Sequence, residues 1–146
     1  MRPTIWLPSV LLATACSSGL TPDELRDGIP AHGVEVVATA TRIASGDNVT
    51  IRITNVGSQA AFLSRCGNQP LVLGRQFVGS EWTGGVQNIL CLVPSTPGPI
   101  RLGPMESITV LRVFDAAGRY RFVVPVSSME DQSDANQAVS NAFDVT

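Results

Sequence analysis

The chain has 146 residues and a net charge of −2, and its ten basic residues are all arginine. The length fits one domain with a short extension, and the weak net charge with few aromatic residues predicts no strong attraction to nucleic acid or to anionic lipid. The absence of lysine excludes Schiff-base chemistry, and a single histidine, His32, gives little material for a histidine triad or a multi-histidine metal site.

The first fifteen residues have the pattern of a targeting segment. Arg2 precedes a short apolar run, residues 5–12, which is too short to span a bilayer as an ordinary transmembrane helix. Ala13-Thr14-Ala15 then forms an A-x-A cleavage site. We therefore predict that residues 1–15 are a signal peptide.

The residue after this site, Cys16, is the informative one. The run from Leu12 to Cys16 resembles the lipobox of bacterial lipoproteins, in which this cysteine is acylated and becomes the mature N-terminus, although the leucine stands one place further from the cysteine than usual. The resemblance implies a membrane partner through the N-terminal lipid and an extracytoplasmic, lipid-anchored location in the cell envelope. Ser17 implies the outer membrane if the host has one. The alternative is an ordinary secretory signal cut at the same bond, which would give a secreted or periplasmic soluble protein.

The number of cysteines agrees with the lipoprotein interpretation. Three cysteines in an exported protein leave one over. If Cys16 carries lipid, then Cys66 and Cys91 remain as a pair in an oxidising compartment. A disulfide between them would close a loop that stabilises the fold by roughly 3.5 kcal/mol. A redox or metal role is the alternative, although neither cysteine lies in a C-x-x-C pattern.

Residues 16–32 are predicted to form the lipidated N-terminus and a tether. Thr21 suits a helix N-cap, Pro22 the first helical position and Gly28 the end, so we expect one or two helical turns there. His32 is expected to be a solvated loop residue. The globular domain is assigned to residues 33–146.

From Val34 the apolar residues recur with period two, the pattern of half-buried strands. Strands are expected near residues 34–39, 49–54 and 60–65, with turns at 45–48 and 55–58. The side chains predicted to point inward are Val34, Val36, Ala38, Val49, Ile51, Ile53 and Phe62.

The chain between the two later cysteines is less regular. Short apolar pieces at residues 71–73, 75–78 and 89–93 surround Trp82, which is either a core anchor or an exposed contact residue on a loop. Residues 94–99 are too rich in proline for a helix or an inner strand.

Residues 107–126 predict two antiparallel strands around a short turn. In the second strand Tyr120, Phe122, Val124 and Val126 share one face, and Arg119 and Arg121 point the other way. The spacing of Asp115, Gly118 and Tyr120 resembles the tyrosine corner of immunoglobulin-like sandwiches, in which the hydroxyl bonds back to the backbone just upstream.

Residues 127–140 form the longest polar stretch. Glu130, Asp131 and Asp134 offer the oxygen ligands that hard cations prefer. The stretch lacks the glycine and the terminal glutamate of an EF-hand loop, so we expect a solvated connection and no metal site. A final strand is expected at residues 142–145.

These patterns together predict an all-β protein, a single immunoglobulin-like antiparallel β-sandwich of seven or eight strands with Greek-key connections. The order of features also resembles the BsuPI-type proteinase-inhibitor domain. The matching features are a strand-turn-strand at 49–63, an aromatic middle at 77–82, Gly-Pro-Met-Glu at 103–106 and Gly-Arg-Tyr at 118–120.

The sequence contains none of the common catalytic motifs, so neither an enzyme nor a cofactor is expected. The leading hypothesis is a non-catalytic, envelope-anchored binding or scaffolding module. It would contact a protein or glycan partner through loops at one end of the sandwich, with Trp82, Glu130, Asp131 and Asp134 as candidate contact residues. The BsuPI resemblance implies the alternative of an extracytoplasmic proteinase inhibitor, and a structural spacer is a third option.

Overall fold

The structure is a computed structural model and describes residues 28–84, 91 and 97–146. The predicted signal peptide, Cys16, the helical turn before Gly28 and most of the predicted strand at 89–93 lie outside these residues.

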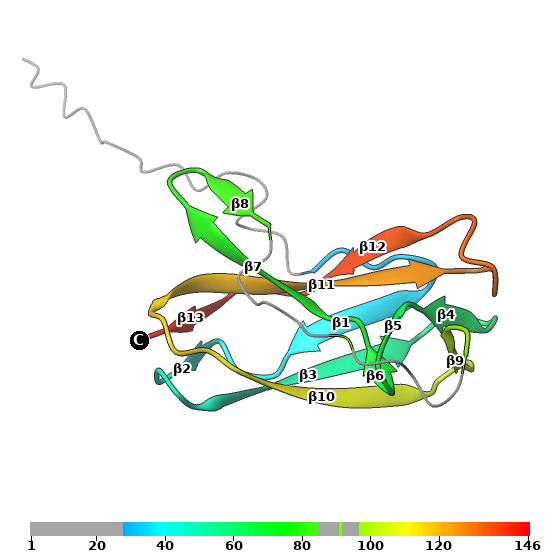
Figure 1. Cartoon of the computed structure of the whole chain (residues 1–146), viewed down its shortest axis with the longest axis horizontal. Helices are drawn as coiled ribbons and strands as arrows, with labels where there is room; N and C mark the ends of the chain where they lie inside the picture. Colours follow the sequence, from blue (N-terminus) through cyan, green and yellow to red (C-terminus); the bar gives the residue numbers. More distant parts are fainter. Residues whose placement is uncertain (1–27, 85–90, 92–96) are drawn as a thin grey trace, which may run out of the picture.

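Two β-sheets pack face to face, and the described residues contain no helix (Figure 1). In the first sheet β3 (Asn48–Asn55) lies between β1 (Val34–Ala38) and β10 (Ser107–Val113), and both pairings are antiparallel. The second sheet is built around the longest strand, β11 (Gly118–Ser127).

Strand β11 pairs with two strands along each of its edges. Along one edge it pairs with β7 (Leu73–Val78) and then β4 (Ala61–Leu63). Along the other it pairs with β13 (Phe143–Val145) and then β12 (Asn136–Val139). The remaining strands of this sheet are β2 (Arg42–Ile43), β8 (Glu81–Thr83) and β9 (Ile100–Leu102), and a separate hairpin is formed by β5 (Arg65–Cys66) and β6 (Gln69–Pro70).

This arrangement is an all-β sandwich, as predicted. The sheet of β1, β3 and β10 faces the sheet that contains β4, β7, β11, β12 and β13. This is the grouping of strands in an immunoglobulin-like sandwich. The chain crosses between the sheets after β3, β9 and β10, as Greek-key connections require. The described part has thirteen strand segments instead of seven or eight, because several long strands are interrupted.

One pairing is parallel, against the expectation of a purely antiparallel sandwich. After Ala38 the chain leaves β3 and continues onto the second sheet, where β2 pairs parallel with β13. The side chain of Asn141, which lies between β12 and β13, hydrogen-bonds to the backbone at the point where the chain crosses to the second sheet. Its Oδ1 accepts a hydrogen bond from the Ala38 N–H at 2.9 Å, and its Nδ2 donates to the Ala38 carbonyl at 3.2 Å. The amide thus replaces a strand residue where the two sheets meet.

The inward faces follow the predicted alternation with one exception. All the predicted inward residues of β1, β3 and β11 are buried. Phe62 was predicted to point inward and does not: it is half-buried, and Ala61 and Leu63 fill the core instead. The pairing of Leu63 with Val126 of β11 sets this register, and three consecutive apolar residues left the choice open.

Four aromatic rings form the centre of the core. Phe114, Tyr120, Phe122 and Phe143 lie with ring centroids 4.6–6.0 Å apart. The Tyr120 hydroxyl donates to the carbonyl of Ala116 at 2.9 Å, which is the backward hydrogen bond of a tyrosine corner. Gly118 has φ +156°, a conformation that residues with a side chain rarely adopt, and a Cβ there would also lie 3.2 Å from the Tyr120 ring, so glycine is favoured.

Residues 28–32 pack on the sandwich, which corrects their assignment to the tether. Ile29 exchanges two backbone hydrogen bonds of 2.8 Å with Val139, and Ala31 is part of the core. These bonds extend the second sheet beyond β12, so the packed domain begins ahead of residue 33.

We predict that Tyr120→Phe lowers the free energy of unfolding by about 1 kcal/mol, because the Ala116 carbonyl loses its donor while the ring packing stays. Urea denaturation followed by circular dichroism measures this change. Thr109→Val is the control, since Thr109 is exposed and its loss should change the stability by less than about 0.5 kcal/mol. Equal effects of the two substitutions would contradict a stabilising corner.

Candidate functional site

The polar loop after β11 is organised around the carboxylate of Asp134. This carboxylate accepts hydrogen bonds from the hydroxyls of Ser127 and Ser128 and, at 3.1 Å, from the Ser128 N–H. The bond from Ser127, followed by that from Ser128, lowers the pKa of Asp134 to about 2. Asp134 therefore holds the loop together from within.

The neighbouring side chains of this loop are also used locally. Asp131 accepts from the Ser133 N–H at 3.0 Å, and hydrogen bonds with Ser133 lower the pKa of Asp131. Gln132 donates to the Phe62 carbonyl at 3.2 Å and so ties the loop to β4. Glu130 makes no side-chain hydrogen bond to the part of the chain that the structure describes, and it is exposed.

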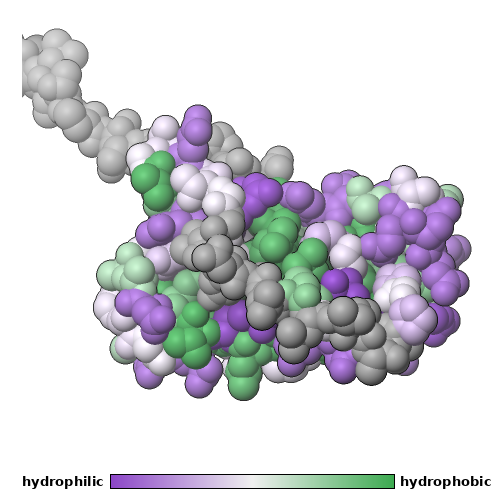
Figure 2. All heavy atoms as spheres, in the orientation of Figure 1, coloured by the Kyte–Doolittle hydropathy of each residue, from purple (hydrophilic) through white to green (hydrophobic). Residues whose placement is uncertain are grey.

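His32 joins this loop to the start of the domain. Its Nε2 lies 2.9 Å from the Asp134 carbonyl oxygen, and its Nδ1 lies 3.7 Å from Asp134 Oδ2. His32 is thus an exposed turn residue, as expected, and it also bridges the loop to the start of the domain. Beside it is an open hollow of about 260 Å³, and Figure 2 shows hydrophilic side chains gathered over this end of the sandwich. The hollow is lined by His32, Gly33, Gly57, Ser58, Gln59, Ala60 and Ser128.

The loop shows no metal site. Within residues 28–84, 91 and 97–146, no group of three or more histidine, cysteine, aspartate or glutamate residues is placed to hold an ion. What the loop offers instead is an exposed, internally braced surface with carboxylates.

Trp82 lies neither in the inter-sheet core nor on a loop. It is on β8, in the hairpin that β7 and β8 form above the second sheet (Figure 1). Its ring packs edge-on against Phe77, with centroids 5.2 Å apart, and the Arg121 guanidinium lies 4.2 Å from the centre of its ring. Such stacking fixes the orientation of a guanidinium.

The structure does not bring Trp82 and the acidic residues together. Arg121, which Trp82 contacts, and Ser127, which contacts Asp134, are six residues apart on β11, so they are separated by roughly 20 Å of extended strand. The candidate contact residues thus belong to two separate surfaces.

The sequence did not predict that a cluster of arginines around Trp82 forms a candidate binding site. Arg75 on β7 lies directly opposite Arg121 on β11, and Arg119 lies on the same outer face of the sheet. We call Arg75, Arg119, Arg121, Phe77 and Trp82 the arginine face. The outward direction of Arg119 and Arg121 was predicted, but their meeting with Arg75 depends on the pairing of β7 with β11.

Trp82 Nε1 and Arg119 Nε, two donors of the arginine face, are buried and have no hydrogen-bond partner among the described residues. Arg75 donates to Gln137 Oε1 at the long distance of 3.3 Å. The guanidinium groups of this surface are suited to a ligand that brings acceptor oxygens.

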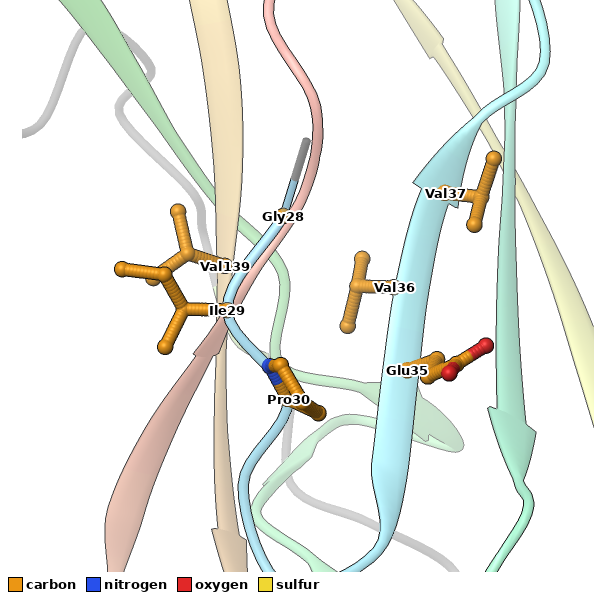
Figure 3. A pocket seen from close by; sticks show the side chains of 7 residues that line it. All are labelled: Gly28, Ile29, Pro30, Glu35, Val36, Val37 and Val139. Atoms are coloured by element: carbon orange, nitrogen blue, oxygen red, sulfur yellow. The ribbon is translucent and has the colours of Figure 1, made fainter. Parts of the chain in front are cut away.

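A small cavity of about 150 Å³ lies between residues 28–30 and β1 (Figure 3). Figure 3 shows that the side chains of Ile29 and Val139 point away from β1. The cavity is lined by Gly28, Ile29, Pro30, Glu35, Val36, Val37 and Val139. It is smaller than the sites that hold drug-sized ligands.

Cys66 and Cys91 form the expected disulfide. It begins on β5, outside the inter-sheet core. No helix in the described residues is long and apolar enough to cross a membrane.

No protein-family model matches the chain, and a search of curated proteins also finds no match. Solved structures that are similar to the chain include the following three. The soluble domain of PmoD from Methylocystis sp. ATCC 49242 has 8% identity and a TM-score of 0.42, covering 84% of this chain and 99% of that one. The CARDB domain of PF1109 from Pyrococcus furiosus has 16% identity and a TM-score of 0.35, with coverage of 77% and 92%. The ASH / PapD-like domain of human CEP192 has 11% identity and a TM-score of 0.38, with coverage of 95% and 96%. Likeness at this level assigns no partner or activity to the chain.

We predict that the Asp134 carboxylate stabilises the fold at neutral pH and not in strong acid. Because folding lowers its pKa from 3.8 to about 2, its contribution is present above pH 3.8 and is lost as the pH falls through about 2. The stability difference between wild type and Asp134→Asn, measured by urea denaturation, should therefore shrink over this interval. Glu130→Gln on the same loop is the control, and a difference independent of pH would contradict the role of the carboxylate.

Proposed function

We propose that this protein is an extracytoplasmic lipoprotein whose sandwich serves as a non-catalytic binding or scaffolding domain. The observation that carries the proposal is the Cys66–Cys91 disulfide. A structural disulfide is typical of an oxidising compartment, and this pairing leaves Cys16 as the remaining cysteine, immediately after the A-x-A site. Acylation of Cys16 would give this thiol a function and place the domain in the cell envelope.

The loop after β11 supports a binding role at one end of the sandwich. Its backbone is held by Asp134 and Gln132, so the loop would lose little conformational entropy when a partner binds. Glu130 is left exposed on it. A protein or glycan partner would contact this loop and the adjacent turn at residues 56–60.

We predict that Cys16→Ala moves the protein from the membrane fraction to the soluble extracytoplasmic fraction and abolishes labelling by a fatty-acid analogue. Fractionation and labelling of the host measure both outcomes, and capture by cross-linking should lose any envelope partner that needs the anchor. Cys66→Ala with Cys91→Ala is the control, since it removes two thiols and should leave labelling intact. A soluble, unlabelled wild-type protein would refute the anchor.

A second candidate is a proteinase inhibitor, favoured by the same braced and exposed loop. Inhibitors of this class present a rigid loop to a protease cleft, with little change on binding. If the inhibitor function holds, the purified protein should slow at least one secreted protease, and Glu130→Ala should weaken that inhibition while Thr109→Val should not. A broad protease panel without inhibition would eliminate this candidate.

A further inference from the structure

The arginine face carries a local excess of positive charge on a protein whose net charge is −2. Arg75 and Arg121 are cross-strand neighbours on β7 and β11, although like charges placed directly opposite destabilise a sheet. The acidic residue closest in register is Asp144, which lies opposite Arg119. Glu81 is the residue just before Trp82 on β8, so its side chain points to the other side of the hairpin. Within residues 28–84, 91 and 97–146, the arginines of this face thus outnumber its acidic neighbours.

The arginine side chains are positioned rather than loosely solvated. Arg121 is stacked on Trp82, and Trp82 is itself held by Phe77. Arg119 Nε and Trp82 Nε1 are buried, with no acceptor in the part of the chain that the structure describes. One face of the tryptophan ring is covered by Arg121, which makes sugar stacking on that side unavailable. The chemistry on offer is therefore recognition of anionic oxygen atoms by guanidinium groups.

The N-terminus of the described chain places this face near the anchor. Ile29 pairs antiparallel with Val139, and β12 pairs antiparallel with β11, so residues 28–31 run in the same direction as β11. Gly28, where the described chain begins, is therefore the residue of this segment nearest to the end of β11 that carries Arg119 and Arg121. Residues 17–27 separate Gly28 from Cys16 and can span at most roughly 40 Å. The arginine face is therefore close to the point where the tether joins the domain.

We propose that the arginine face docks on the anionic headgroups of the membrane that holds the acyl chains of Cys16. The proposal rests on the lipid anchor proposed above. Basic side chains near an anionic membrane surface are each attracted to it, and this attraction fades within a Debye length. Docking by three arginines would be weak for a free domain, but the anchor keeps the face near the bilayer. The interaction then sets the orientation of the domain.

The test uses the chain from residue 16 onward with Cys16→Ser, which keeps every described residue and removes the acylation site. Trp6 is lost with the signal segment, so Trp82 is the single tryptophan and its fluorescence reports directly on the arginine face. Vesicles of phosphatidylcholine, with and without phosphatidylglycerol, are the probes. We expect co-sedimentation with the anionic vesicles at low salt and quenching of Trp82 by brominated lipid.

The variants Arg75→Ala, Arg119→Ala and Arg121→Ala should each weaken vesicle binding about fivefold, while Arg119→Lys should retain it. Arg52→Ala is the matched control, because Arg52 is exposed on β3, in the other sheet. Urea denaturation of each variant shows whether the fold is intact. Failure of the wild-type chain to bind anionic vesicles, or an equal loss with Arg52→Ala, would overturn the proposal.

The identity of the anionic partner is tested in the same assay. A Trp82 signal that changes with poly-glutamate but not with anionic vesicles would replace the membrane by an acidic polypeptide and overturn the proposal. The anchor is judged separately: an unacylated Cys16 in the host, together with vesicle binding here, would refute the anchor and support lipid recognition by the arginine face.

Discussion

The packing of four aromatic rings between the sheets determines most of this structure. Phe114, Tyr120, Phe122 and Phe143 close the sandwich at the corner where β10 turns into β11, and the rest of the core is mainly aliphatic. Burial of Tyr120 and Phe122 fixes the register of β11. The same register places Arg119 and Arg121 on the outer face, because a slip of one residue would move both arginines into the core. The core thus positions the arginine face.

The sequence predicted the faces of a strand wherever polar and apolar residues alternate. This holds for β3 and for the first half of β11, where residues such as Arg52, Arg119 and Arg121 mark the outward positions. In β1 the outward position of Val37 carries no such mark. The pattern fails at Ala61-Phe62-Leu63, where both faces are apolar and only the pairing with β11 decides between them. The interruptions of the long strands could not be predicted either. At one of these interruptions the side chain of Asn141 takes the place of backbone groups in hydrogen bonding to Ala38, a residue far away in the sequence.

Composition proved a poor guide to which polar groups are available for a partner. The stretch after β11 is rich in oxygen atoms, but Asp134 and Asp131 are satisfied by serines of the same loop. A sequence shows which carboxylates are close to one another along the chain, but it does not show which hydrogen-bond donors each of them already binds. The arginine face is the opposite case. Its residues are individually ordinary outward arginines, and they become a cluster only because β7 pairs with β11.

Because of these two surfaces, the two ends of the domain along β11 differ in charge. The arginine face lies near the beginning of this strand, and the loop with Glu130, Asp131 and Asp134 follows its end. Under the proposed anchoring, anionic headgroups attract the first surface and repel the second, so both charges favour the same orientation. The braced loop would then point away from the lipid, toward a protein or glycan partner in the envelope. A short tether can therefore leave the domain free to move and still let electrostatics decide which end is presented.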